Sequence, residues 1–565
     1  MSKEKKQRVS RREFLKGAAA AGATMAAAGM LGPLTPTASA QVPDKWDAEA
    51  DVIVVGTGMA GYGAAIEAKD AGADVMMIEK EKWYGGNSVL AGGNCQMPVN
   101  HINKAAGIED RPEWAYEDYW TYGQHRGVPE MIRLFVDNAA DTALWLEKLG
   151  VVWNKTPSLQ GDCRVARTLV PTVSATYPGG LEAGINAGMA LIAVLNKAAT
   201  DRKITMKMET KLTRLIRTDP KGPVIGIEAV SGGKTLNFKA KRAVVLATGG
   251  FKVNNQMVRA WHPLLDETFQ WSGGPYTHTV GEGHLAAMAI GAGLTDTSFT
   301  MGFPNNFGRS VYVYWDPVGE MTAKAKKSPV LASPLGTPDK PSPWAFLVEN
   351  DGNRYVDENS RPAGEGSLDD PWTVAWLMLP KRPRNVWAVV DSAGAAALKW
   401  NLDDFKNASE TKSPYLDPKW VAYADTIADL ATKMGMPPAN LEATVKKYNE
   451  YAAAGVDKDF KKPKPFNPIA QGPFFGAKMI LFAHDQCNGI RVNTKLQVID
   501  QTFQLETGSA PSVPLDKERV IPHLYGAGEF AGGTFGAARG SGKMGSYAVQ
   551  GRLAGKNAAK ETPVT

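Results

Sequence analysis

The chain has 565 residues, 44% of them hydrophobic and 22% charged, with a formal net charge of +6, and this length allows two or three domains with a substantial buried core. Residues 1–16 carry seven Lys or Arg and two Glu, which leaves the rest of the chain close to neutral and excludes the basic surface typical of a nucleic-acid-binding protein. Cys95, Cys163 and Cys487 lie far apart and no CxxCH occurs, so the cysteines indicate neither a metal site nor an attached haem.

The first 40 residues predict an export signal. An arginine pair, Arg11 and Arg12, precedes an apolar run rich in Ala and Gly over residues 17–31, and Ala38-Ser39-Ala40 matches a small-x-small cleavage site. The pair is typical of the twin-arginine pathway, which exports folded proteins that took up a cofactor in the cytoplasm. We therefore expect a periplasmic protein that begins at Gln41. Since no other run of ~18 apolar residues occurs, no integral membrane segment is expected after cleavage.

Residues 51–79 predict a dinucleotide-binding βαβ unit. A strand over residues 51–55 leads into a glycine turn, an Ala-rich helix and a second strand over residues 74–78. In the turn Gly56-Thr57-Gly58-Met59-Ala60-Gly61, the first glycine permits the bend, the second lets backbone approach a pyrophosphate, and the third lets helix and strand pack closely. Helix N-terminal amides favour phosphates, and Glu79 is placed to accept hydrogen bonds from a ribose. This fingerprint alone fits NAD as well as FAD.

Later segments favour FAD, because they resemble those of the fumarate reductase and succinate dehydrogenase flavoprotein family. Gly85-Gly86-Asn87-Ser88 and Ala91-Gly92-Gly93 resemble its second FAD segment, and Ala247-Thr248-Gly249-Gly250 ends an apolar strand as in the family. Thr279-Val280-Gly281-Glu282-Gly283 matches the family's Thr-Gly-Asp-Gly element, with Glu in place of Asp. The closing segment is matched by residues 524–533 and 551–555. The resemblance covers nearly all of the chain after residue 40.

The resemblance implies an α/β fold, in which a Rossmann-like (GR2-type) FAD-binding domain carries an inserted α+β capping domain. The expected boundaries are residues 1–40 for the signal peptide, 46–301 for the first part of the FAD-binding domain, 302–470 for the capping domain and 471–565 for the second part. The chain is similar to the flavoprotein part of a flavocytochrome c fumarate reductase, without the haem domain. In the capping domain, Leu441, Val445 and Tyr448 follow helical spacing, which predicts one helix over residues 430–451.

The resemblance also implies how FAD is held. The His that forms the covalent bond in covalent relatives is missing from Asn87-Ser88-Val89-Leu90, so the FAD is expected to be non-covalent, and no metal is expected. A helix N-terminus is expected to face the flavin carbonyls near Lys543 and Met544. The residues expected to bind FAD are Gly58, Ala60, Gly61, Glu79, Lys80, Asn87, Ser88, Gly92, Gly93, Leu212, Gly249, Glu282, Asp485, Glu529, Lys543 and Met544.

Three side chains are expected to carry the chemistry. In the family, a substrate carbon–carbon bond lies over flavin N5, which exchanges a hydride, while an Arg of the capping domain delivers the proton. By position, His484 binds the substrate, Arg539 binds its carboxylate and Arg361 is the proton donor. Arg361 falls one residue short of the family's position, so a structural salt bridge is an equal alternative. A core histidine and a surface ion pair are the alternatives for His484 and Arg539.

The predicted substrate is an α,β-unsaturated carboxylate or related enoyl compound other than fumarate. Phe303 precedes Pro304 where the fumarate reductases have a His that binds the second carboxylate. An apolar or aromatic substrate end therefore fits better. Further aromatic residues, which are also usual in a core, lie nearby in the sequence: Trp271, Phe299, Phe307, Tyr312, Tyr314 and Trp315.

The electron donor is expected to be a separate cytochrome or quinol-linked partner, because exported enzymes meet little nicotinamide cofactor. Two other functions stay open. One is a desaturating dehydrogenase of the 3-ketosteroid type, although the Tyr that such enzymes use is absent just after Glu358. The other is a flavin-binding electron carrier without substrate chemistry.

Overall fold

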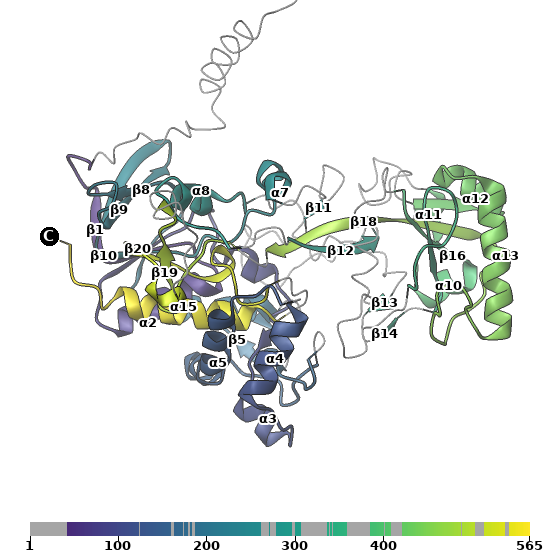
Figure 1. Cartoon of the computed structure of the whole chain (residues 1–565), viewed down its shortest axis with the longest axis horizontal. Helices are drawn as coiled ribbons and strands as arrows, with labels where there is room; N and C mark the ends of the chain where they lie inside the picture. Colours follow the sequence, from purple (N-terminus) through teal and green to yellow (C-terminus); the bar gives the residue numbers. More distant parts are fainter. Residues whose placement is uncertain are drawn as a thin grey trace, which may run out of the picture.

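The computed structural model describes residues 42–123, 125–159, 163–172, 175–178, 181–182, 187–261, 270–271, 278–295, 300–306, 336–337, 340–341, 343–358, 385–400, 402–407, 421–486, 489–502, 514–536 and 542–564. These residues form two bodies joined by the strands β12 (Thr300–Asn306) and β18 (Phe474–Gln486) (Figure 1). The larger body contains both ends of the described chain. The smaller body contains the helices numbered α10 to α13.

The larger body is built on a sheet of eight described strands. Five run parallel in the order β20 (Val520–Gly526), β10 (Lys234–Leu246), β1 (Ala48–Val55), β2 (Val75–Ile78) and β7 (Thr205–Lys207). The antiparallel strands β9 (Val224–Ser231), β8 (Thr210–Arg217) and β19 (Gln497–Ile499) extend it. The central strands are buried on both faces, as is usual for parallel strands between helices. The α/β fold is therefore confirmed, as is the strand, helix and strand order predicted for residues 51–79.

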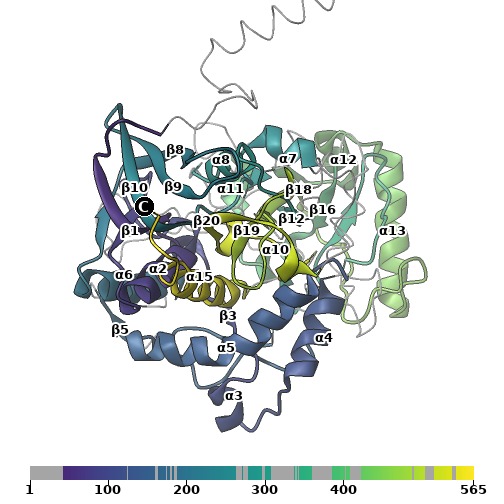
Figure 2. The ribbon, with the colours of Figure 1, turned by 60° about the vertical axis from the view of Figure 1, so that its left-hand side comes forward.

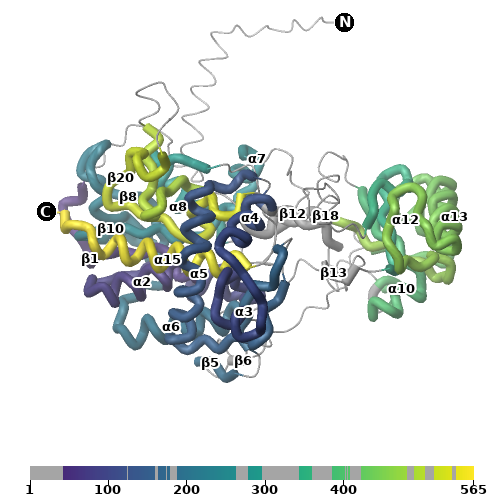
Figure 3. The backbone as a smooth tube through the Cα atoms, turned by 60° about the horizontal axis from the view of Figure 1, so that its bottom comes forward, coloured from purple at the N-terminus to yellow at the C-terminus, as the bar shows by residue number. Residues whose placement is uncertain are grey.

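Helices from opposite ends of the chain pack against each other beside this sheet. α2 (Met59–Asp70) lies along α15 (Met544–Ala558) in both Figure 1 and Figure 3. A Cβ at Gly551 would overlap the carbonyl oxygen of Ala60, and a Cβ at Gly555 would overlap that of Ala64. Both pairs advance by four residues, so the helices run in the same direction with their backbones in contact. Since Met544 lies two turns before Gly551, the N-terminus of α15 extends about 10 Å beyond that of α2.

Further helices cover the outside of this pair. α3 (His101–Ala105), α4 (Pro112–Tyr122) and α5 (Pro129–Leu149) lie together on the side of α15 (Figure 2). α6 (Ala187–Asp201) packs against α2, and α7 (Asn255–Trp261) and α8 (Glu282–Met288) follow the end of β10. The short strands β3 (Cys95–Gln96) and β4 (Thr168–Leu169) pair next to the start of α15. In the described part of the chain, no helix combines the length and the apolar character needed to cross a bilayer.

The smaller body is a second sheet covered by helices. β18 is its central strand and pairs with β16 (Trp387–Val390), β17 (Val421–Ala424), β11 (Gln270–Trp271) and β12, while β15 (Phe346–Val348) pairs with β16. α10 (Ser392–Ala397), α11 (Leu402–Lys406), α12 (Ile427–Met434) and α13 (Pro438–Ala454) surround it, and β13 (Gly336–Thr337) pairs with β14 (Lys340–Pro341). β18 thus begins in the smaller body and ends at Gln486 in the larger one. The predicted domain boundaries, close to β12 and β18, stay predictions.

The prediction of one helix over residues 430–451 is wrong. The structure has two helices here, because Gly435 takes a left-handed conformation with φ of 72° and ends α12. Pro437 is then extended, and Pro438 starts α13 at a position where its missing N–H costs nothing. Leu441, Val445 and Tyr448 are buried on one face of α13, so the helical spacing was interpreted correctly and only the break was missed.

The backbone contact between α2 and α15 predicts an unusual effect of a Gly→Ala change. In an unobstructed helix, Gly→Ala stabilises by roughly 1 kcal/mol. Gly555→Ala is instead expected to lower the free energy of unfolding by about 1–3 kcal/mol, because the methyl group overlaps the Ala64 carbonyl. Urea unfolding measures this, with Lys560→Ala, whose side chain is exposed directly after the end of the same helix, as the control. A stabilised Gly555→Ala variant would contradict the close approach.

Candidate functional site

The N-terminus of α2 forms a cradle of glycines. Gly56 has φ of 104°, and a Cβ at Gly61 would overlap the Gly56 carbonyl oxygen, so both positions require glycine. At Gly58 an added Cβ would come no closer than 3.5 Å to its nearest neighbour, Ser88 Oγ, and Gly58, the N-cap residue, has no side chain that could cap the helix. Ser88 Oγ itself accepts a hydrogen bond of 3.1 Å from Met59 N. The first turn of α2 therefore offers backbone amides to an anion.

Glu79 directly follows β2, beside this turn, and is 8% exposed. Its carboxylate accepts hydrogen bonds from Thr57 N at 3.2 Å, Thr57 Oγ1 at 2.6 Å and Glu81 N at 3.1 Å. Burial raises the pKa of Glu79 above its usual value, although these hydrogen bonds oppose the shift. Thr57 Oγ1 also accepts from Gly85 N at 2.9 Å. Thr57 thus joins three predicted segments. Thr57 was not among the residues expected to bind FAD, although it occupies the variable position between the first two fingerprint glycines.

A second group of contacts brings Lys80, Asn87 and Glu282 together. Lys80 Nζ lies 2.6 Å from Glu282 Oε1 and also donates to the His278 carbonyl oxygen. His278 Nε2 lies 2.8 Å from Asn87 Oδ1, and its ring meets that of Trp83 edge to face at 5.1 Å. Burial, with Lys252 and Lys80 nearby, lowers the pKa of His278 to about 3, which keeps the ring neutral. His278 was missed, and its place directly before the Thr279 motif was the available indication.

A third group joins the motif around Gly249 to Glu529. Gln486 N donates to Glu529 Oε1 at 2.9 Å, and Gln486 Oε1 accepts from Phe251 N. Gly249 has φ of 70°, and a Cβ at Gly250 would overlap Gln486 Oε1. Gln486 follows the predicted Asp485 but was itself missed. It places the end of β18 next to two of the predicted FAD motifs.

The N-terminus of α15 lies at a small pocket in this region. Lys543 precedes the helix, and no side chain caps its first turn. The pocket is lined by Gln486, Glu529, Ala531, Thr534, Phe535, Lys543, Ser546, Tyr547 and Gln550. Gln550, also missed, accepts from Gly528 N at 2.8 Å and donates to Thr534 Oγ1 at 2.9 Å. All of these residues belong to the second predicted part of the FAD-binding domain, and the hydrogen bond from Phe251 N to Gln486 Oε1 joins the pocket to the first part.

The described residues fit FAD. The α2 N-terminus suits a pyrophosphate, Glu79 suits a ribose, and the α15 N-terminus suits the carbonyl edge of the flavin ring. Thr248 Oγ1, Thr279 Oγ1 and Asn87 Nδ2 are buried without a hydrogen-bond partner in the described residues, and all three belong to segments that resemble FAD motifs. Gly92 and Gly93 follow the 3-10 helix η1 (Gly86–Leu90), and Leu212 is buried in β8. Among the described residues, no group of potential ligands is arranged to hold a metal ion.

The expected catalytic side chains lie outside the described residues. The backbones of His484 and Asp485 belong to β18, but their side chains are not described, and Arg361 and Arg539 are not described at all. The same holds for the leader with Arg11 and Arg12, and for Phe299, Phe307, Tyr312, Tyr314, Trp315 and Cys487. The alternatives for these side chains therefore stay open.

The described start of the segment that carries Arg361 is anchored by buried charges. Arg354 pairs with Glu358 at 3.0 Å and with Asp457 at 2.9 Å, and Lys462 Nζ lies 3.2 Å from Glu358. Burial raises the pKa of Glu358, but Lys462 and Arg354 outweigh it, so the pKa lies below its usual value. Glu358 is therefore an ionised carboxylate inside the smaller body.

Comparisons with known proteins agree with this site. A family model described as FAD binding domain matches residues 51–544. The chain belongs to this family. Urocanate reductase from Eggerthella lenta is 30% identical over 531 residues, which cover 92% of this chain and 76% of that protein. The structure of the open conformation of a flavocytochrome c3 fumarate reductase matches with a TM-score of 0.68 and 26% identity, over 99% of this chain and 83% of that one.

A third relative extends the range of chemistry. The crystal structure of a 3-ketosteroid-Δ4-(5α)-dehydrogenase from Rhodococcus jostii, in complex with 4-androstene-3,17-dione, matches with a TM-score of 0.66 and 25% identity, over 93% of this chain and 99% of that one. The predicted fumarate reductase and succinate dehydrogenase flavoprotein family and the predicted FAD cofactor are confirmed. The chain is an FAD-dependent oxidoreductase of this family. The non-covalent character of its FAD stays a prediction.

A buried histidine next to the site predicts a pH dependence. His284 on α8 is fully buried between Phe251 and Phe530, and neither ring nitrogen has a partner in the described residues. Burial lowers its pKa to about 3, whereas an unfolded histidine titrates near pH 6.5. Unfolding therefore takes up a proton between these values, and stability present above about pH 6.5 is lost as the pH falls.

We expect His284→Leu to remove this loss. Between roughly pH 7.5 and pH 5, the unsubstituted protein should lose about 2 kcal/mol of free energy of unfolding that the variant keeps. The reason is that protonation of His284 in the unfolded chain costs about 1.4 kcal/mol of stability for each pH unit below 6.5. Urea unfolding of both proteins at the two pH values measures the difference. A difference that does not change with pH would show that His284 has the same pKa in the folded and the unfolded chain.

Proposed function

We propose that this flavoprotein is an exported reductase of the activated C=C bond of an α,β-unsaturated carboxylate with an apolar or aromatic end. The observation that carries the proposal is Phe303. It stands in the sequence where fumarate reductases bind the second carboxylate, and the register of β12 places it opposite Phe482, two residues from His484 in β18. Urocanate, which the relative's name gives as its substrate, is an acrylate with an aromatic ring and a single carboxylate, and so has the proposed chemistry.

We assign a separate role toward the substrate to each of three side chains. Arg539 binds the carboxylate, His484 polarises the substrate, and Arg361 delivers the proton to the carbon next to the carboxylate. Reduced FAD, when bound, would supply the hydride to the other carbon of the double bond. Cationic groups at the carboxylate lower the barrier because negative charge develops there in the transition state. With a reference pKa above 12, Arg361 can act as an acid only within a proton relay in a closed site.

The proposed location and electron donor follow from the leader. The twin-arginine signal would place the folded, FAD-loaded protein in the periplasm, where little nicotinamide cofactor is present. Electrons would then come from a separate cytochrome or quinol-linked partner. The flavocytochrome in the comparison carries its cytochrome in its name, which supports haem as a donor in this family.

A second candidate runs the reaction in the opposite direction. The similarity to a ketosteroid dehydrogenase favours a desaturating dehydrogenase that removes hydrogen from a saturated ketone. The absence of a Tyr just after Glu358 weighs against it. The direction of electron flow separates the two candidates.

Reoxidation of the reduced flavin tests the proposal. The purified protein is photoreduced without oxygen and mixed with urocanate, cinnamate, crotonate or fumarate, and the return of the flavin absorbance is followed. We expect the monocarboxylates with a ring to reoxidise the flavin at least tenfold faster than fumarate. Equal or faster reoxidation by fumarate would overturn the substrate class, and reduction of oxidised flavin by a 3-ketosteroid would favour the second candidate.

Arg539→Ala separates an enzyme from an electron carrier. The variant should retain FAD but lose at least a hundredfold in the rate of reoxidation by the best enoate, because an arginine–carboxylate pair is lost. Arg133→Ala, on the exposed face of α5, is the matched control. The electron carrier would be supported if no enoate reoxidised the flavin of either Arg539→Ala or the unsubstituted protein, and if both proteins transferred electrons between artificial donors and acceptors at the same rate.

A further inference from the structure

Gln96 is wedged against the first turn of α15. Its backbone N donates to the Gly542 carbonyl oxygen at 2.8 Å, and its neighbour Cys95 forms a β-bridge with Lys543. A Cβ at Gly545 would overlap the Gln96 carbonyl oxygen, and a Cβ at Gly542, which has φ of 107°, would overlap Gln96 Cγ. The two glycines on either side of the helix start therefore close around Gln96. Any displacement of Gln96 displaces this turn.

Tyr119 fixes the side chain of Gln96 from the opposite side. Its hydroxyl donates to Gln96 Oε1 at 2.5 Å, and Cys163 Sγ lies 3.7 Å from the same oxygen. Tyr119 is fully buried, and burial raises its pKa well above the usual value, so the hydroxyl keeps the proton that it donates. The Tyr119 ring meets Phe535 edge to face at 5.4 Å. Phe535 in turn lines the pocket at the α15 N-terminus.

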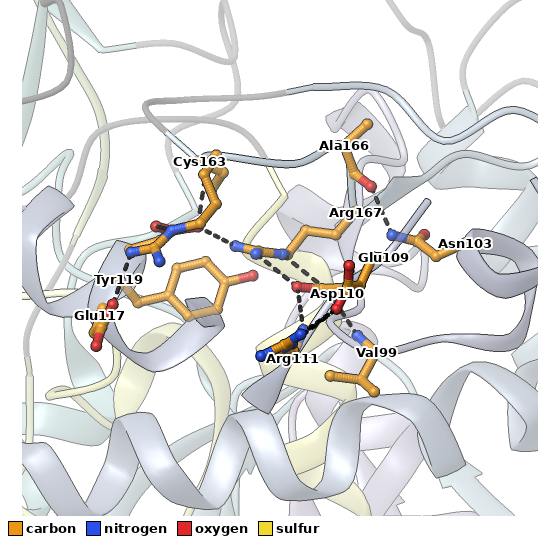
Figure 4. Close-up of polar contacts among 12 residues, drawn as sticks. Val99, Asn103, Glu109, Asp110, Arg111, Glu117, Tyr119, Cys163, Ala166 and Arg167 are labelled. Atoms are coloured by element: carbon orange, nitrogen blue, oxygen red, sulfur yellow. Dashed lines mark hydrogen bonds and ion pairs between the residues drawn. The ribbon is translucent and has the colours of Figure 1, made fainter. Parts of the chain in front are cut away.

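A buried ion cluster supports Tyr119 from behind. Arg167, whose side chain is 0% exposed, pairs with Asp110 at 2.8 Å (Figure 4). It also pairs with Asp118 at 2.7 Å. Its guanidinium lies 5.8 Å from the centre of the Tyr119 ring, and its carbonyl oxygen accepts from Met97 N at 2.9 Å. Burying three charges costs desolvation energy that their attraction often fails to repay. A gain in stability therefore does not explain why Arg167, Asp110 and Asp118 are buried together. A role in fixing the geometry of the adjacent site does explain it.

We propose that Tyr119 and Gln96, supported by Arg167, are positioning residues that hold the N-terminus of α15 against the flavin ring and so set the reduction potential of bound FAD. The inference rests on the proposed placement of the ring carbonyls at Met544. Reduction adds negative charge to this edge of the ring, and a helix N-terminus stabilises negative charge only within its first turn. A small displacement of the turn therefore weakens the binding of reduced FAD more than that of oxidised FAD.

Tyr119→Phe tests the inference in the holoenzyme, because it removes one hydroxyl and keeps the ring. We expect reduced FAD to bind about tenfold less tightly relative to oxidised FAD, which lowers the midpoint potential by about 30 mV for a two-electron couple. Spectroelectrochemical titration measures the potential without any substrate. Gln96→Met removes the acceptor of the same hydrogen bond and serves as the second variant. The double variant should show the shift of either single variant rather than their sum.

Tyr451→Phe is the matched control. Tyr451 on α13 is also buried, and its hydroxyl donates to Asp459 Oδ1 at 3.0 Å in the smaller body, outside the predicted FAD motifs. We expect the midpoint potential of this variant to equal that of the unsubstituted protein. The inference is overturned if Tyr119→Phe and Gln96→Met keep the original potential, if they lose only thermal stability, or if Tyr451→Phe shifts the potential equally.

The outcomes for this inference and for the proposed function are separate. Failure of every enoate to reoxidise the flavin overturns the proposed substrate class and leaves the potential measurement intact. Rapid reoxidation by enoates together with an unchanged potential in both variants overturns only the positioning role.

Discussion

The backbone of α15 touches the backbone of α2 at Gly551 and Gly555, and the cofactor site depends on this contact. The two helices come from opposite ends of the chain, yet they run in the same direction with an offset of about two turns. Their N-termini therefore face the same region at different heights, separated by about 10 Å. An extended cofactor with a charged pyrophosphate and a distant polar ring edge needs two such sites in this order. A side chain at either glycine would separate the helices and misplace one of the two termini.

The second constraint is the long strand β18. Its first residues pair with β16 and β17 in the smaller body, and its last residue, Gln486, bonds Glu529 and Phe251 in the larger one. One continuous strand therefore connects the sheet of the smaller body to the acid expected to hold FAD. His484 and Asp485 lie on the same strand, directly before Gln486. This arrangement supports the proposal that neighbouring residues of β18 contact the substrate and the flavin.

The predictable part of the site is the part set by local requirements. The roles of Gly56, Gly58 and Gly61 could be predicted from their spacing, because each role is set by a turn or a close contact within one βαβ unit. Thr57, His278, Gln486 and Gln550 each lie next to a predicted motif residue, but their partners are between 16 and 235 residues away in the chain and could not be predicted from a local pattern. The helix over residues 430–451 shows the opposite limit. Its apolar spacing continues across this point, but Gly435 and the pair Pro437-Pro438 are local signals of a helix end and a helix start, to which the apolar pattern gave too little weight.

The central claim is that the staggered N-termini of α2 and α15 receive two parts of one FAD, and a crystal structure of the FAD complex tests it most directly. We expect the pyrophosphate within hydrogen-bonding distance of the Ala60 and Gly61 amides, and a carbonyl oxygen of the flavin ring within hydrogen-bonding distance of Met544 N. A structure in which the ring carbonyls are bound by other groups, away from the first turn of α15, would contradict it.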